Sequence, residues 1–140
     1  LTLCCDYRLI AAGHKLMGLN EVKLGVPVPF PAACVLPHIV GDRNAREMMY
    51  TGDFYSPKQA YGMGLVDEVV QIEQVRSRSI EKAKALSAGS AQAITQIKRG
   101  HIERIKTQIE KLLEESEVNF INRWYADDTR KNLKEAMDKF

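Results

Sequence analysis

The chain has 140 residues and a formal net charge of +2, with 45% hydrophobic and 27% charged residues. This composition is typical of one folded globular domain and excludes a disordered or fibrous chain. So small a charge argues against a nucleic-acid partner, and the absence of a long apolar run argues against a membrane span.

Short extended segments are predicted in the first third of the chain. Residues 7–11 mix apolar and polar side chains and stop before Gly13, which is typical of a strand. Residues 15–17 and 22–24 are two further extended candidates, each closed by a glycine. Prolines at alternate positions then predict a stiff loop over residues 27–31, with neither helix nor central strand.

Helix signals begin after this loop. Asp42 can cap a helix that continues to Tyr50. The signal for the start of a second helix is clearer, because Ser56 can serve as its N-cap with Pro57 at the first helical position. Gln59 completes the capping box, and two glycines a few residues later should end this helix.

The chain beyond a strand predicted at residues 65–70 is expected to be helical. One helix is predicted from residue 73 to near residue 89. A long helix follows, with apolar residues at three- and four-residue steps over 94–120, a stripe expected to form core or a subunit interface. A last helix begins near Asp127, and its predicted apolar face comprises Leu133, Ala136, Met137 and Phe140.

Short motifs stand in a characteristic order along nearly the whole chain. They are CDYR at 5–8, GLNE at 18–21, LG at 24–25, PF at 29–30, TG at 51–52, GMGLVD at 62–67 and FINRWYADD at 120–128. Together these motifs resemble the crotonase superfamily, the enoyl-CoA hydratase/isomerase family. Their details are similar to those of mitochondrial-type Δ3,Δ2-enoyl-CoA isomerases.

The resemblance implies an α/β fold in two parts. Residues 1–70 would form the C-terminal part of the crotonase α/β core, a ClpP/crotonase-like ββα spiral. Residues 71–140 would form the helical C-terminal region, through which family members assemble into trimers and hexamers. Leu1 would then correspond to a position midway through the family core, so a fragment without the two oxyanion-hole amides is expected. Because such donors stabilise the charge that develops in the transition state, the chain alone is expected to be inactive.

Glu21 matches the carboxylate that hydratases and isomerases of this family share. Isomerising a 3-enoyl thioester means removing a proton from C2 and returning one to C4, and a single carboxylate on one face can do both. Apolar neighbours such as Leu19, Val26 and Phe30 are expected to favour its neutral form, so that it serves as base and as acid. Hydration also needs a second carboxylate, which in the family's hydratases would stand directly before Leu1.

The residues around Glu21 favour an isomerase over a hydratase. Hydratases commonly have proline where this chain has Asn20, and a glycine-rich loop where residues 27–31 are rich in proline. By the resemblance, Asn20 would touch the acyl thioester, while Pro29 and Phe30 would line the acyl pocket. For Glu21 the alternative is a solvated glutamate at a strand edge. For Asn20 the alternative is an asparagine that only forms a turn.

Other functions remain open beside the isomerase. They are enoyl-CoA hydration, thioester hydrolysis or decarboxylation on the same fold, and a non-catalytic helical module for oligomerisation. The predicted partner is an acyl-CoA thioester, with coenzyme A as part of the substrate and no separate cofactor. A group of basic residues could contact the phosphates of coenzyme A. The alternative is a solvated helix face whose positive charge is compensated by Glu103 and Glu110. This group comprises Lys98, Arg99, Arg104, Lys106, Lys131 and Lys134.

Cysteine and histidine usage predicts no metal site. The histidines are scattered, and Cys4, Cys5 and Cys34 lack metal-ligand spacing, so they are expected to be buried thiols in a reducing compartment. Asp6 is expected to accept hydrogen bonds from Arg8 or the backbone at the start of the first strand. The location predicted for such an enzyme is cytoplasmic, or the mitochondrial matrix or peroxisome in a eukaryote.

Overall fold

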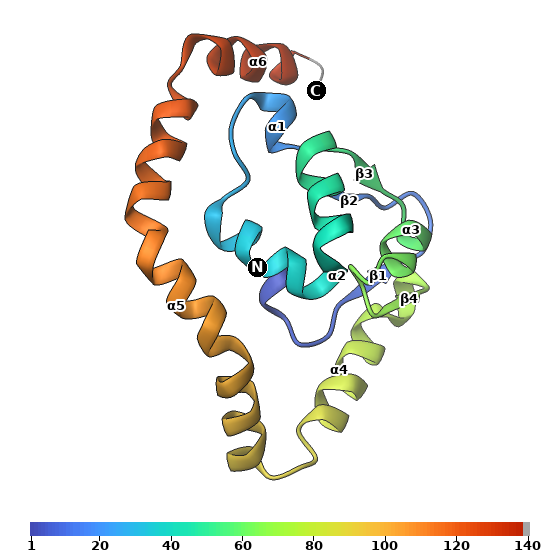
Figure 1. The fold of residues 1–140 in the computed structure, drawn as a ribbon. Helices are drawn as coiled ribbons and strands as arrows, with labels where there is room; N and C mark the ends of the chain where they lie inside the picture. Colours follow the sequence, from blue (N-terminus) through green and yellow to red (C-terminus); the bar gives the residue numbers. More distant parts are fainter. Residues whose placement is uncertain (139–140) are drawn as a thin grey trace.

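Helices dominate the computed structural model, which describes residues 1–138 (Figure 1). The first elements are η1 (Thr2–Cys4), β1 (Leu9–Ala11), β2 (Met17–Gly18), α1 (Glu21–Leu24), α2 (Phe30–Thr51), β3 (Phe54–Tyr55) and α3 (Pro57–Gly62). The remaining elements are β4 (Glu68–Val70), η2 (Ile72–Gln74), α4 (Val75–Leu86), α5 (Ala91–Trp124) and α6 (Asp127–Met137).

Two short strand pairs form the β structure of the described residues. β1 pairs in parallel with β4, with Ile10 opposite Val69, and β2 pairs antiparallel with β3, with Met17 opposite Tyr55. The strands predicted at 7–11 and 65–70 are therefore confirmed in shortened form. A parallel pair needs a long crossover, and here that crossover carries β2, α1, α2, β3 and α3. Glu21 lies within this crossover, between β2 and β3 in the sequence.

The hydrophobic core lies between α2 and the strands. Its residues are almost completely shielded from solvent, and they are Ile10, Leu36, Val40, Ala45, Met48, Tyr55, Ala60, Leu65 and Val66. All of them come from the first 66 residues. Residues 1–70, which contain this core, are called the compact region. In this part of the chain the sequence alternates strand and turn signals.

The proline-rich segment differs from the prediction. α2 begins at Phe30, so residues 27–31 are not wholly a loop, and Pro31 lies in the first helical turn. Proline is tolerated there because the first backbone N–H groups of a helix have no intrahelical partner. The helix predicted from Asp42 is the second half of α2, and Gly41, with φ 75° and ψ 158°, breaks the helical geometry in front of it.

Residues 22–24 are helical, and the prediction of an extended segment there is wrong. The Lys23 N–H donates to the Asn20 carbonyl at 3.0 Å, and Gly25 ends the turn in the left-handed conformation. The short apolar and polar alternation of Val22-Lys23-Leu24 suits a strand and a single helical turn equally well. The glycine that appeared to close a strand is a helix C-cap.

The capping box predicted for α3 is confirmed. The Ser56 backbone N–H donates to the Gln59 side chain at 2.9 Å, and the Ser56 hydroxyl accepts from the Gln59 N–H at 3.4 Å. The helix ends at Gly62, as the sequence predicted. Local side-chain chemistry is sufficient here, because both partners lie within one turn.

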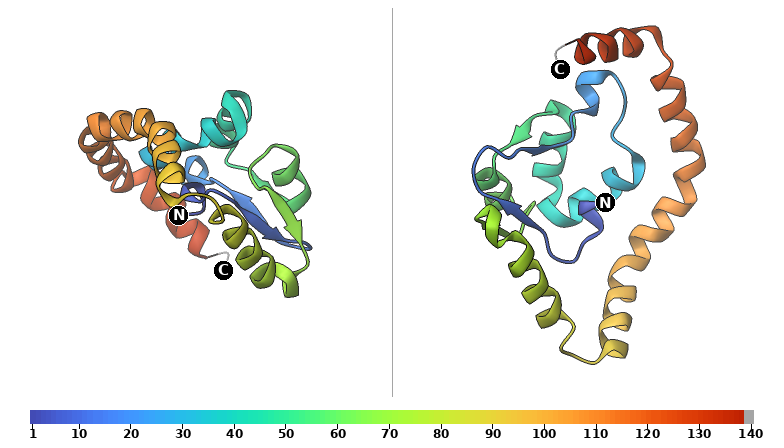
Figure 2. Two further views of the ribbon diagram at one scale, coloured as in Figure 1. Left: turned by 90° about the horizontal axis from the view of Figure 1, so that it is seen from below. Right: turned by 180° about the vertical axis from the view of Figure 1, so that it is seen from behind.

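The three C-terminal helices are confirmed, and they extend around the compact region (Figures 1 and 2). α4 and α5 diverge from their connecting turn, and α6 lies beside α1. α4 starts at Val75, after the 3-10 turn η2, and Phe140 of the predicted last face lies outside the described residues. Neither α4 nor α5 contains a buried residue, and Ile97 is 73% exposed, so the apolar stripe does not form core here.

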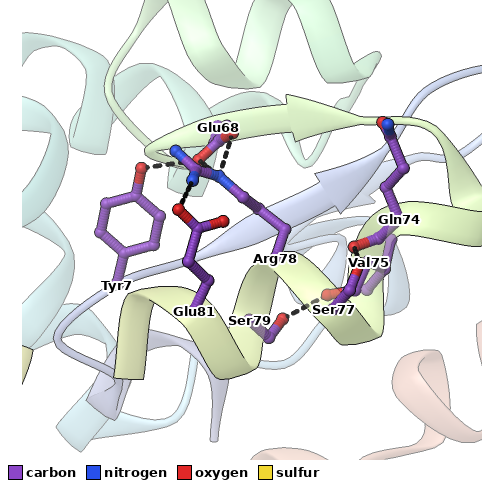
Figure 3. Close-up of polar contacts among 8 residues, drawn as sticks. All are labelled: Tyr7, Glu68, Gln74, Val75, Ser77, Arg78, Ser79 and Glu81. Atoms are coloured by element: carbon purple, nitrogen blue, oxygen red, sulfur yellow. Dashed lines mark hydrogen bonds and ion pairs between the residues drawn. The ribbon is translucent and has the colours of Figure 1, made fainter. Parts of the chain in front are cut away.

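A polar cluster attaches α4 to β4 (Figure 3). Arg78 Nε donates to both carboxylate oxygens of Glu68, at 2.8 and 3.1 Å, and Arg78 also pairs with Glu81 at 2.7 Å. The Tyr7 hydroxyl donates to Glu68 at 3.0 Å, and the Lys82 ammonium lies 4.7 Å from the centre of the Tyr7 ring. The Arg78 contact, followed by that of Tyr7, holds the pKa of Glu68 below its usual value.

The polar contacts near the N-terminus correct two predictions. Asp6 pairs with Lys98 on α5 at 2.7 Å, whereas Arg8 pairs with Asp67 at 3.2 Å. Cys4 and Cys5 are exposed, so buried packing is correct only for Cys34, whose burial raises the pKa of its thiol. Within residues 1–138, no helix combines the length and the apolar character that crossing a membrane requires.

Candidate active site

Glu21 lies at the first position of α1, directly after the β2 segment. Its side chain is half-buried, and its Oε2 atom is fully buried without a hydrogen-bond partner among the described residues. Buried polar atoms are nearly always paired, because an unpaired one loses its hydration without compensation. This oxygen therefore has an unused hydrogen-bonding capacity within the described residues.

The C-terminal end of α2 holds one side of α1. A Cβ atom placed on Gly52 would lie 2.8 Å from Val22 Cγ1 and would force that side chain to shift, and the φ of +63° also favours glycine here. Lys23 pairs with Asp53 at 2.6 Å and holds the pKa of Asp53 below its usual value. These contacts fix the single helical turn that carries Glu21.

Pro29 and Phe30 lie in a different place from Glu21. Both line a cleft of about 420 Å³ whose opposite wall is α5, with Leu113, Phe120 and Ile121. Neither Asn20 nor Glu21 is among the residues that line this cleft. Pro29 and Phe30 thus lie on an apolar cleft, and the Glu21 carboxylate does not line that cleft.

A larger cleft of about 730 Å³ lies between α5, η1 and the middle of α2, and the sequence did not predict it. Its apolar wall includes Ile39, Ile102 and Ile105, and its charged groups include Lys98 and Lys106. The cleft forms where two segments far apart in the sequence meet. No local motif could have indicated it.

The basic group predicted from the sequence does not form one surface. Lys98 is paired with Asp6, and Lys106 lies 3.7 Å from Glu110, one of its two predicted balancing acids. Lys131 is on α6, beyond the far end of the 34-residue α5, and pairs with Glu135. The part of α5 from Lys98 to its end at Trp124 spans about 40 Å, so Lys98 and the lysines of α6 do not meet one phosphate.

Arg123 and Thr129 are contacts of α1 that sequence reasoning missed. Both bind the carbonyl of Gly25, the residue that ends α1. Thr129 lies two residues after the predicted start of the last helix, and the sequence carries no signal for its complete burial. Among the described residues, no group of three or more His, Cys, Asp or Glu side chains is placed to hold a metal.

Comparison with known proteins adds the decisive observation. The profile of the family described as enoyl-CoA hydratase/isomerase matches residues 1–140. The chain belongs to this family. Its fold is that of the crotonases, because it superimposes on human mitochondrial Δ3,Δ2-enoyl-CoA isomerase with a TM-score of 0.91, at 28% identity and over 98% of the chain.

Two curated relatives carry different reaction names. The chain is 41% identical over 80 residues, 56% of its length, to mitochondrial enoyl-CoA delta isomerase 1 of Mus musculus. It is 32% identical over 113 residues, 81% of its length, to crotonyl-CoA hydratase of Syntrophomonas wolfei. The matches cover 28% and 43% of these proteins and 54% of the human chain, so the sequence spans about half or less of each relative's length.

Proposed function

We propose that this chain supplies the proton-transferring half of an enoyl-CoA isomerase, with Glu21 as the group that carries the proton. The proposal is supported chiefly by the buried, unpaired Oε2 atom of Glu21. It is supported also by the similarity to two proteins named as enoyl-CoA isomerases.

The proposed reaction moves one proton and one double bond. The carboxylate of Glu21 takes a proton from C2 of a 3-enoyl thioester, and the electron pair of that bond forms a dienolate with charge on the thioester oxygen. The same carboxyl group then gives a proton to C4, and the double bond comes to rest between C2 and C3. Oxygen atoms already engaged in internal hydrogen bonds would be weaker bases, so an unpaired oxygen suits this role.

The thioester oxygen needs hydrogen-bond donors of its own during this reaction. We place these donors in the part of the family's core that the chain does not match. Asn20 is proposed to contact the thioester, and Pro29 and Phe30 to bound the acyl chain along the cleft against α5. No separate cofactor is proposed, since coenzyme A arrives with the substrate.

Hydration of a 2-enoyl thioester is the second candidate. It is favoured by the match to crotonyl-CoA hydratase, which extends over 81% of the chain. The two reactions differ in their products, because hydration adds water and isomerisation conserves mass. Mass spectrometry of the products from 3-enoyl and 2-enoyl thioesters separates them.

The test of Glu21 is substitution by glutamine in the complete protein that carries this sequence. Glu21→Gln keeps the size of the side chain but removes the base, so turnover of a 3-enoyl thioester should fall about 10²- to 10⁴-fold. Glu47→Gln, on the exposed surface of α2, is the matched control and should keep full activity. Undiminished turnover by Glu21→Gln would remove the catalytic role.

We propose that the helical region, residues 71–140, mediates self-association of the protein into a trimer or hexamer. α5 exposes several large apolar side chains, and they are Ile94, Ile97, Ile102, Leu112, Val118 and Ile121. Light scattering after size exclusion measures the assembly. A protein that is monomeric at micromolar concentration would contradict this part of the proposal.

A further inference from the structure

The carbonyl oxygen of Gly25 is bound by two side chains from the corner between α5 and α6. Arg123 donates to it through Nε at 3.0 Å and through Nη2 at 2.9 Å, and the Thr129 hydroxyl donates at 3.1 Å. Arg123 Nη2 also donates to Thr129 Oγ1 at 3.3 Å and to Asp128 at 2.8 Å. One backbone oxygen therefore receives three donors from residues about 100 positions away in the sequence.

Thr129 is the one buried polar or charged residue among those the structure describes, with 0% of its surface exposed. Its hydroxyl both donates to Gly25 and accepts from Arg123, so its hydrogen-bonding capacity is used within this contact. Burying a hydroxyl is unfavourable unless it is paired in this way. The contact is thus a specific one, rather than an incidental meeting of two surfaces.

The backbone conformation of Gly25 and its lack of a side chain permit this close contact with Thr129. It has φ +87°, and a Cβ atom at this position would lie 2.9 Å from Thr129 Oγ1. Any other residue would push the α5–α6 corner away from α1. Figure 1 shows α6 beside α1, on the side away from α2.

The same glycine is one helical turn from Glu21. The Gly25 N–H donates to the carbonyls of Glu21 and Val22, and the Val26 N–H donates to the Glu21 carbonyl at 3.2 Å. α1 has only four residues, and so short a helix has no stability of its own. Its orientation, and with it the direction of the Glu21 side chain, must come from the contacts at its two ends.

We infer that Thr129 and Arg123 are positioning residues that set the orientation of Glu21 through the Gly25 carbonyl. This inference rests on the proposed function, since it assumes that Glu21 carries the proton. It assigns to the C-terminal corner a part in the reaction, beyond the packing of α6. Misplacing a catalytic group by about 1 Å can lower the rate about 100-fold, so the effect is measurable.

The experiment compares Thr129→Val with Thr129→Ser in the complete protein, at a temperature well below the melting temperature of both. Valine keeps the shape but cannot donate, so kcat for the 3-enoyl thioester should fall about 10- to 100-fold with KM little changed. Serine keeps the hydroxyl and should restore kcat. Arg123→Gln should lower kcat in the same way, whereas Arg130→Gln, an exposed arginine seven positions on, should not.

A residue that served only stability would give a different result. Thr129→Val would then lower the melting temperature while the folded fraction kept its wild-type kcat, and this outcome overturns the inference. If Thr129→Val fails to fold, Arg123→Gln decides alone, because a folded variant with unchanged kcat also overturns it. Glu21→Gln is measured in parallel: loss there with unchanged Thr129→Val refutes the positioning role only, and full activity there refutes the proposed function itself.

Discussion

The compact region up to residue 70 and the helical region after it are stabilised in different ways. The core residues all belong to the first 66 positions, and α4 and α5 together contain no buried residue. Removal of apolar surface from water is the main favourable contribution to folding. Most of the stability of this chain must therefore come from the compact region.

The helical region packs against α2 through half-buried side chains of α5, and polar contacts attach it at two further points. α4 is bound through Arg78 and Glu68, and the α5–α6 corner is bound through Arg123 and Thr129 to Gly25. The partly solvated Arg78–Glu68 pair contributes little stability, whereas the hydrogen bonds of Arg123 and Thr129 fix the position of the corner against α1. The comparison teaches that the geometry of α1 depends on the region that contributes least to stability.

Truncating an apolar side chain in each region gives the largest expected contrast. Leu36→Ala removes a completely buried side chain and should lower the free energy of unfolding by about 2–5 kcal/mol. Leu86→Ala, at a position 52% exposed on α4 and outside the α5 surface proposed for self-association, should change it by no more than about 0.5 kcal/mol. Urea unfolding measures both, and comparable losses would show that α4 contributes to a core.

Adding a methyl group to two glycines separates backbone strain from the contact with α6. Gly25 and Gly13 both have positive φ, but nothing lies within 4 Å of a Cβ placed on Gly13. Gly13→Ala should therefore show the strain alone, about 1–3 kcal/mol. Gly25→Ala should lose more, because its Cβ meets Thr129 Oγ1. Equal losses in urea unfolding would mean that the α5–α6 corner moves freely.

Removing one N-cap in each region sharpens the comparison at smaller energies. Ser56→Ala should lower the free energy of unfolding by about 1 kcal/mol, because the cap of α3 is lost next to the core. Ser90, the N-cap of α5, accepts a hydrogen bond from the Ala93 N–H at 3.4 Å. Ser90→Ala should instead increase amide hydrogen exchange in the first turn of α5, with global unfolding unchanged. A global loss equal to that of Ser56→Ala would contradict the separation of the two regions.

Acid should loosen α4 before it affects the core. The pKa of Glu68 is lowered in the folded chain, so its contribution is fully present above the unfolded pKa and is lost as pH falls through the lower folded value. The protection factors of the α4 amides, which correct for the slower intrinsic exchange in acid, should therefore fall as the pH is lowered from about 5 towards 3. Glu68→Gln should abolish most of this pH dependence, and an unchanged profile in that variant would assign it to another group.

Elements specified by nearby residues could be predicted from the sequence, whereas the assembly of the site could not. The capping box of Ser56 and Gln59 and the long apolar repeat of α5 follow from spacing alone. Glu21 was identified by the motif around it, yet the sequence indicated an extended segment where α1 forms. That single turn is ended by Gly25 and fixed by Thr129, more than 100 residues later, and contacts of this range leave no periodic signal.

The fate of the C2 proton tests the proposed role of Glu21 most directly. A 3-enoyl thioester carrying deuterium at C2 is converted by the complete protein in a single turnover, and the product is examined for deuterium at C4. If one carboxylate carries the proton, part of the label should appear at C4, and Glu21→Gln should slow its transfer about 10²- to 10⁴-fold. Wild-type conversion by Glu21→Gln, with the same label distribution, would contradict the account.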